Sequence, residues 1–172
     1  MKGLLFVVTF FISSTIFAAV NSVKIPMHLV TTNGHDESVG YVVAKNSPEG
    51  LMLYPHLHGL PPGVHGFHVH TYPSCKDHGM AAKGHLDPKH TGKHLGPYNT
   101  KGHLGDLPVL VVSKNGTSSL PLLAPKLTVN DIVGHTLMIH ADGDNYSDKP
   151  AINGGGGERL ACGVITLPKA DK

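Results

Sequence analysis

The feature that most constrains the fold is a series of short apolar or alternating runs, bounded by glycine, proline, asparagine or aspartate. No stretch shows sustained helical spacing, and 21 glycines and 13 prolines would interrupt any long helix. Short strands separated by turn residues are typical of a sandwich or barrel. We therefore predict an all-β domain with little helix, with strands at residues 23–30, 39–45, 50–57, 63–70, 107–112, 135–140 and 162–167.

The length of 172 residues suits a single domain, and the chain has no internal repeat and no interdomain linker. Two stretches between predicted strands, 71–106 and 141–161, are too long for hairpin turns. Long ordered loops on a rigid β scaffold usually carry function. Histidines crowd into the first of these loops, which makes it the candidate site.

The N-terminus has the three parts of a secretory signal peptide: Lys2, an uncharged apolar run at 4–17, and the small residues Ala18 and Ala19. The apolar run of 14 residues falls short of the roughly 18 expected of a membrane-spanning helix. We predict that residues 1–18 are the signal peptide, with cleavage between residues 18 and 21. Residues 19–172 would then form one exported domain with no membrane attachment.

Export makes Cys75 and Cys162 natural partners, because disulfides persist in oxidising compartments and an even count leaves no odd thiol. We predict one disulfide between them, which closes a loop of more than eighty residues. In the chain-entropy model such a loop contributes about 4 kcal/mol to stability.

The charge pattern excludes two classes of partner. The formal net charge is +2 and only 15% of residues are charged, so the chain has no basic tract suited to nucleic acid or to an anionic membrane surface. Histidine is the anomaly, since its 14 residues outnumber the 12 acidic ones in a chain whose one arginine is Arg159. This imbalance indicates metal binding.

His68 and His70 are alternate residues of a predicted strand, so both imidazoles face one side and can reach one metal ion. His140 ends another apolar run and would complete an all-imidazole site of the kind that copper favours. The alternatives are two ordinary half-exposed histidines and one core histidine with a hydrogen-bond partner.

Three histidines and one aspartate follow in the first long loop: His85, His94, His103 and Asp106. They supply the nitrogen and oxygen ligands of a closed tetrahedral zinc site, which needs no thiolate. A solvated histidine-rich loop is the alternative.

Five strings, in this order along the chain, resemble the copper,zinc superoxide dismutase family in its bacterial periplasmic branch. They are GFHVH at 66–70, GHLDP at 84–88, TGKHLGP at 91–97, GHLGDLP at 102–108 and GERLACGVI at 157–165. Together they are far more specific than any one motif. The resemblance implies a single-domain Greek-key β-sandwich or barrel of about eight strands with two long functional loops.

The same resemblance implies one copper and one zinc per chain. Copper would be bound by His68, His70, His85 and His140, and zinc by His85, His94, His103 and Asp106. By this resemblance the imidazolate of His85 bridges the two metals and takes up a proton during catalysis. The implied catalytic residues are His85 and Arg159, the latter beside the copper.

The guanidinium of Arg159 would attract and orient the superoxide anion, because a planar fork presents two donors to a small anion. A structural salt bridge is the alternative. Asp144 lies where the family places a carboxylate that links a copper histidine to a zinc histidine, and Asp148 is its rival. His90 is interpreted as a solvated loop residue, since the Lys-His-x-Gly-Pro context belongs to His94.

The implied activity is that of a superoxide dismutase, which disproportionates superoxide to dioxygen and hydrogen peroxide by redox cycling of copper. Such an enzyme would protect the periplasm against superoxide. Two other hypotheses are a non-enzymatic copper- and zinc-binding protein and a metal-dependent hydrolase, although the hydrolase would need an open zinc position.

His56 and His58 form another pair on one face of a predicted strand. We interpret them as surface residues, and the alternative is an accessory metal or haem site at a subunit contact. The resemblance allows a homodimer, but no spacing in the sequence distinguishes it from a monomer.

Overall fold

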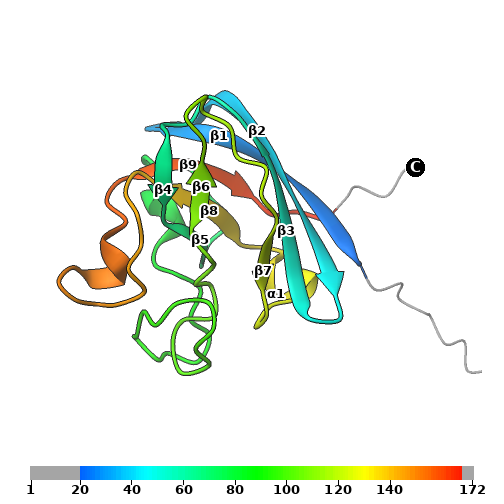
Figure 1. Cartoon of the computed structure of the whole chain (residues 1–172), viewed down its shortest axis with the longest axis vertical. Coiled ribbons are helices and arrows are strands. Elements are labelled where there is room, and N and C mark those ends of the chain that lie inside the picture. The colour runs from blue at the N-terminus through cyan, green and yellow to red at the C-terminus, as the bar shows by residue number, and fades with distance from the viewer. Residues whose placement is uncertain (1–19, 168–172) are drawn as a thin grey trace, which may run out of the picture.

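The computed structural model describes residues 20–167 and confirms the prediction of an all-β fold (Figure 1). Its nine strands are β1 (Ser22–Thr31), β2 (Gly34–Ser47), β3 (Gly50–Leu57), β4 (Gly63–His65), β5 (Phe67–His70), β6 (Leu110–Val112), β7 (Leu122–Ala124), β8 (Thr136–His140) and β9 (Arg159–Val164). The helical elements are short: α1 (Val129–Ile132) and the 3₁₀ turns η1 (Met80–Ala82) and η2 (Ile152–Gly155).

The predicted signal peptide, residues 1–18, lies outside the described residues. Within residues 20–167, none of the helices has the length and apolar character needed to cross a membrane.

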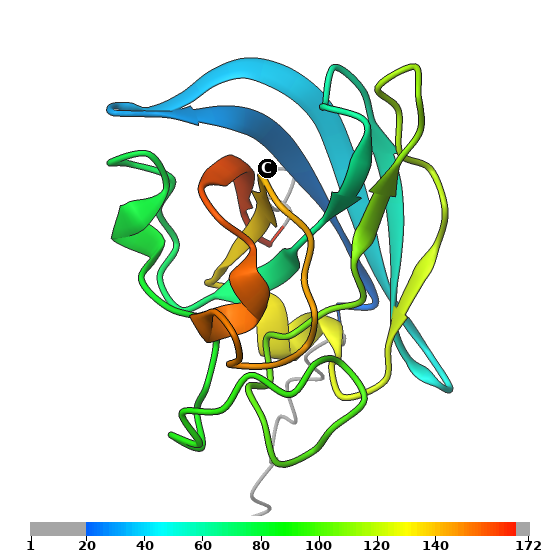
Figure 2. The same cartoon turned by 60° about the vertical axis from the view of Figure 1, so that its left-hand side comes forward.

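Seven antiparallel strands form one curled sheet in the order β5-β8-β9-β1-β2-β3-β7, and β4 pairs with β6 in a second, two-stranded sheet. Gly66 alone separates β4 from β5, so one extended segment runs from the small sheet into the large one. Figures 1 and 2 show the large sheet wrapping around the interior, with the long loops gathered outside β5 and β8.

The core follows from the two-residue period of the strands. In β1 the side chains of Val23, Ile25 and Met27 are buried, while those of Ser22 and Lys24 are exposed. Successive side chains of a strand point to opposite faces, so the alternation in sequence becomes an inside and an outside. Each fully buried Ile or Leu in such a core contributes roughly 1.5–3 kcal/mol.

The strands β5 and β8 depart from this alternation, because every residue of both is buried. Phe67 and Val69 belong to the hydrophobic core, whereas His68 and His70 lie on the opposite face. The long loops run in front of that opposite face (Figure 2), and His68 and His70 are 0% and 1% exposed. A second buried layer, which is polar, therefore lies between the outer face of the sheet and the loops.

Backbone hydrogen bonds fix the first loop along the free edge of β5. The Val69 amide donates to the carbonyl of Gly105 at 2.9 Å, and the Leu86 amide donates to the carbonyl of Val69 at 2.8 Å. A Cβ atom on Gly105 would lie 2.3 Å from the Val69 oxygen, so only glycine permits this approach. The loop thus pairs the backbone N–H and C=O groups of an edge that would otherwise be open to pairing with another chain.

Besides shifts of a few residues at strand ends, such as β2 at 34–47 and β6 at 110–112, three differences from the predicted strands stand out. Gly66 divides the segment predicted at 63–70 into β4 and β5. The short strand β7 was missed, because the prolines around it give no alternating pattern. Strand β9 begins at Arg159 instead of Cys162, so Arg159 pairs directly with His140 and the second loop ends earlier than predicted.

The predicted disulfide between Cys75 and Cys162 is confirmed, with the two Cα atoms 6.1 Å apart. Both residues are buried and pack with Ala82 and Met138. The bond ties the loop after β5 to strand β9.

Replacing both cysteines, in a Cys75→Ala/Cys162→Ala variant, should lower the free energy of unfolding by about 4 kcal/mol. The physical reason is that a crosslink spanning 87 residues restricts the unfolded chain. Urea titration measures the difference. The reduced wild-type protein is the control and should unfold at the same urea concentration as the variant. Equal stability of the variant and the oxidised wild type would contradict this account.

Candidate metal centre

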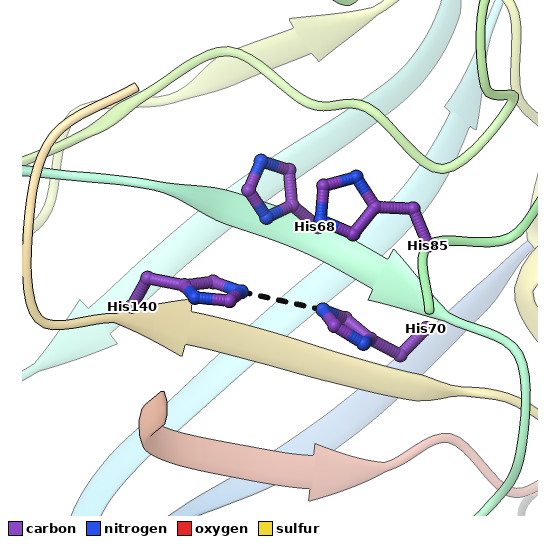
Figure 3. A group of neighbouring side chains, drawn as sticks. All are labelled: His68, His70, His85 and His140. Carbon is purple, nitrogen blue, oxygen red and sulfur yellow. Dashed lines mark hydrogen bonds between the residues drawn. The ribbon is translucent and has the colours of Figure 1, made fainter. Parts of the chain in front are cut away.

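Four buried histidines converge at the outer face of β5 and β8: His68, His70, His85 and His140. Each offers one ring nitrogen, and these four nitrogens lie within 4.8 Å of one another. Figure 3 shows the imidazoles of His68 and His70 on one strand, with His140 on the neighbouring strand and His85 arriving from the loop. We call this group the first cluster.

Hydrogen bonds assign the tautomers in the first cluster, because carboxylates and carbonyls only accept. His68 Nε2 donates to Asp144 Oδ2 at 2.8 Å, which leaves the buried Nδ1 with no hydrogen-bond partner. His70 Nδ1 donates to the carbonyl of Lys83 at 2.7 Å, so Nε2 of the neutral ring carries a lone pair. This Nε2 lies 3.3 Å from His140 Nε2, within hydrogen-bond distance (Figure 3). The lone pairs of His68 Nδ1 and His70 Nε2 therefore belong to one group of buried ring nitrogens.

A second cluster adjoins the first and consists of His85, His94, His103 and Asp106. Asp106 Oδ1 lies 3.0 Å from the Nδ1 atoms of His85 and His94 and 3.4 Å from Nδ1 of His103. The Nδ1 atoms of His94 and His103 are buried without a hydrogen-bond partner. An ion with bonds of about 2.0–2.1 Å in a tetrahedron holds its ligand atoms roughly 3.3 Å apart, so these separations fit zinc.

His85 belongs to both clusters. Its Nδ1 faces Asp106 at 3.0 Å, and its ring stacks on that of His68 with centroids 3.9 Å apart. Since one ring nitrogen faces the second cluster, the other nitrogen, Nε2, is the one available to the first. A single imidazole therefore spans the two groups of ligands.

Asp144 joins the clusters a second time, because Oδ2 accepts from His68 and Oδ1 accepts from His94 Nε2, both at 2.8 Å. The rival residue Asp148 instead accepts the backbone amides of His94 and Asn153, at 3.0 and 3.2 Å. The geometry therefore places Asp144, and not Asp148, between one histidine of each cluster. Such a carboxylate fixes the orientation of both rings.

Burial sets the charge state of the first cluster. Burial and the neighbouring His85 lower the pKa of His68 to about 3, and the same two causes lower that of His140 to about 4. Burial also lowers the pKa of His70 well below its ordinary value. All three imidazoles are therefore neutral near pH 7, the state in which imidazole binds a metal.

The second cluster has the opposite electrostatics. Burial alone would lower the pKa of His94, but the carboxylates of Asp106 and Asp144 outweigh it and raise this pKa to about 9. Burial would raise the pKa of Asp106, yet its histidine neighbours, His103 first, hold it far below its usual range. In the metal-free protein a proton on His94 therefore occupies the place of the cation.

The first cluster opens into a cavity of about 220 Å³ that Arg159 also lines. Nη1 of Arg159 donates to the carbonyl of Gly79, and Nη2 donates to the carbonyl of Lys83. The Lys83 carbonyl thus accepts from both Arg159 and His70, which connects the guanidinium to a residue of the first cluster. Glu158, which the sequence did not single out, lines the same cavity.

A model of the family described as copper/zinc superoxide dismutase (SODC) matches residues 38–165. The chain belongs to the copper/zinc superoxide dismutase family. Superoxide dismutase [Cu-Zn] 1 of Salmonella typhimurium is 53% identical over 86% of this chain and 88% of its own length. Superoxide dismutase [Cu-Zn] of Legionella pneumophila is 45% identical, over 95% of this chain and 98% of its own length.

The solved structure of the Cu/Zn superoxide dismutase from Brucella abortus superposes with a TM-score of 0.79 and 44% identity, covering 84% of this chain and 99% of that one. These comparisons confirm the family resemblance that the sequence strings carried. They also confirm the class of enzyme and the pair of metals, copper and zinc, that the family uses.

His56, His58 and His90 belong to neither cluster. His90 is exposed, whereas His94 is fully buried, which agrees with the interpretation of His90 as a solvated residue. His56 and His58 are exposed, and His56 stacks on Tyr41 with ring centroids 4.7 Å apart. An accessory metal or haem site at this pair stays a prediction.

Two contributions to the site were missed in the sequence. His65 is buried, and its ring nitrogens lie 2.8 Å from the carbonyl oxygens of His140 and Pro61, but a lone histidine has no spacing signal. The four glycines at residues 154–157 lie in the second long loop, and nothing in the sequence indicates their contact with the site. At Gly154, which has φ +78°, a Cβ atom would lie 1.9 Å from Asp144 Oδ1 and 2.9 Å from His94 Nε2.

Gly154→Ala should weaken metal binding about 10- to 100-fold, because the methyl group displaces the carboxylate that orients His68 and His94. Gly155→Ala is a matched control, since Gly155 has φ +75° but its Cβ would meet nothing closer than Ala151 at 3.6 Å. Chelator competition measures both variants. Equal weakening in the two would mean that backbone strain alone, and not the contact with Asp144, is responsible.

Zinc binding at pH 7 should release about one proton from His94, because its pKa of about 9 keeps the metal-free imidazole protonated. For this group, zinc affinity should rise with pH up to about 9 and then level off. Calorimetry in buffers of different ionisation enthalpy counts the protons. Asp144→Asn should reduce the number released, and zinc binding without proton release would refute the assignment.

Proposed function

We propose that the protein disproportionates two superoxide anions and two protons to dioxygen and hydrogen peroxide, with one copper at the first cluster and one zinc at the second. The copper ligands would be His68, His70, His85 and His140, and the zinc ligands His85, His94, His103 and Asp106. The observation that carries the proposal is the position of His85, whose two ring nitrogens serve the two clusters.

The donor sets support this division of the metals. Copper favours an all-imidazole set and supplies the one-electron redox chemistry of both half-reactions. Zinc has no redox chemistry, and a set of three nitrogens and one carboxylate oxygen closes its tetrahedron. The closed set argues against a hydrolase, which would need an open zinc position.

His85 is proposed to hold and release a proton at Nε2. Its Nδ1 is fixed on the side of Asp106, so the imidazole keeps its place when Nε2 is protonated. Burial lowers the pKa of His85, so the ring is neutral near pH 7 in the metal-free protein. In the proposed role, Nε2 of His85 takes up a proton and then delivers it to the peroxide that forms from the second superoxide.

Arg159 is proposed to attract and orient the superoxide anion. Two of its nitrogens are held by the carbonyls of Gly79 and Lys83, which fixes the plane of the guanidinium beside the cavity. A guanidinium has five N–H donors, so donors remain for the anion. A cation at the wall of an anion-binding cavity also raises the rate of encounter.

The cellular role is proposed to be protection against superoxide in the periplasm. The support is the predicted signal peptide at residues 1–18, with residues 19–172 as the mature domain, together with a buried disulfide suited to an oxidising compartment.

The purified protein should contain about one copper and one zinc per chain and should dismutate superoxide. Arg159→Ala should retain both metals while kcat/KM falls roughly 10- to 100-fold, because the anion loses its fixed donors. Arg159→Lys keeps the charge without the planar fork and should fall in between. Stopped-flow decay of superoxide and metal analysis provide the two readouts.

Full metal loading with negligible activity of the wild-type protein would refute the enzyme and favour a metal-storage or copper-delivery protein. Unchanged kcat/KM and unchanged salt dependence in Arg159→Ala would refute only the role given to Arg159.

A further inference from the structure

Residues 94–106, which we call the zinc loop, surround the side chain of a distant lysine. Lys126 follows β7, and its Nζ donates to the carbonyls of Gly96, Asn99 and His103 at 3.1, 3.0 and 2.8 Å. An ammonium group has three N–H donors and no acceptor. All three donors of Lys126 are therefore used, and all three acceptors belong to one loop.

The arrangement closes the zinc loop around the ammonium. The His103 amide donates to the carbonyl of Lys93 at 2.9 Å, which brings the two ends of the segment 94–103 together. Carbonyl dipoles that point inward repel one another unless a cation lies between them. Lys126 supplies that cation, so it stabilises a backbone conformation that would otherwise open.

The residues whose carbonyls accept from Lys126 include a proposed zinc ligand and a residue that is hydrogen-bonded to another. His103 is itself a ligand candidate, and its own carbonyl accepts from Lys126. The Gly96 amide donates to Asp106 Oδ2 at 3.1 Å, while the Gly96 carbonyl accepts from Lys126. Gly96 therefore connects the Lys126 ammonium to the Asp106 carboxylate, through its carbonyl on one side and its amide on the other.

The backbone around Lys126 is fixed independently of the zinc loop. Leu127 is buried in the core, and the Val129 amide donates to Asn46 Oδ1 on β2 at 2.7 Å. Thr128 and Asp131 form a capping box at the start of α1, with the Thr128 amide 2.7 Å from Asp131 Oδ2. Lys126 thus reaches from the rigid barrel into a loop with no regular secondary structure of its own.

We propose that Lys126 is a positioning residue that holds His94, His103 and Asp106 in ligand geometry before zinc binds and thereby slows the loss of zinc. This inference rests on the zinc assignment made above. The chemistry selects lysine, because a compact ammonium with a tripod of donors suits three converging carbonyls, whereas the planar guanidinium of arginine does not.

The test compares Lys126→Met with wild type, since methionine keeps much of the apolar stem and removes all three donors. Zinc release from the copper- and zinc-loaded protein is followed with a chromophoric chelator, and zinc affinity is measured on the metal-free protein. Zinc should leave about 10- to 100-fold faster and bind correspondingly more weakly in the variant, the usual size of an effect on residues that support metal ligands.

Two controls separate this role from a general loss of stability. Lys101→Met removes an exposed lysine from the same loop and should release zinc at the wild-type rate. Ile25→Val trims a buried core side chain of β1, lowers global stability and should also leave zinc release unchanged. Hydrogen exchange of the metal-free protein adds a local readout, because the Leu95 and Gly96 amides should lose protection in Lys126→Met while β1–β3 keep theirs.

Zinc release from Lys126→Met within twofold of Lys101→Met would overturn the inference, and so would an equal acceleration in Ile25→Val. Failure of the wild-type protein to bind zinc at all would overturn the zinc assignment itself. Tight zinc binding by the wild type together with unchanged release from Lys126→Met would overturn only the role of Lys126.

Discussion

The structure depends on the backbone pairing of β5 along both of its edges. One edge pairs with β8, and the other bonds to the loop at Leu86 and Gly105. Because a strand alternates its side chains, the same few residues contribute Phe67 and Val69 to the core and two histidines to the site. Any change that loosened this strand would disturb the hydrophobic interior and the metal centre together.

His140 ends β8, and the other proposed ligands lie in the first long loop, which the protein holds with bonds of several kinds. A disulfide ties the loop before His85 to β9. Asp144 joins the second long loop to the first through His94 and to β5 through His68. The ammonium of Lys126 accepts no bond but donates to three carbonyls of the loop that carries His103. Preorganisation of this kind reduces the entropy lost on binding an ion, since the ligands are already ordered. A loop-borne site can then be as well defined as one built on strands.

Much of this could be predicted from the sequence, for physical reasons. The spacing of His68 and His70 fixes a shared face in any strand, and the alternation of Val23, Ile25 and Met27 fixes which face is buried. The ligand inventory also followed from residue types, since imidazoles and one carboxylate suit copper and zinc. The resemblance to the family then implied which histidines bind which metal and that His85 bridges the two, points that residue types alone left open.

Other features had no local signal. The contact of Gly154 with Asp144 and the reach of Lys126 into the zinc loop depend on segments far apart in the chain, so neither composition nor periodicity reports them. The start of β9 at Arg159 was hidden because a glycine run precedes it and breaks the apolar pattern. Strand β7 was also hidden, because the prolines around it leave no alternating pattern and only its pairing with β3 defines it.

The shared carboxylate of Asp144 has a thermodynamic consequence. Its two oxygens each hold a histidine of a different cluster, so the ring that one ion orders is mechanically connected to a ring that the other ion uses. Occupancy of one site then changes the free energy of filling the other, and by reciprocity the second ion returns the same factor to the first. If copper and zinc bind as proposed, a favourable factor makes their loading cooperative and lowers the share of chains that hold only one of the two ions.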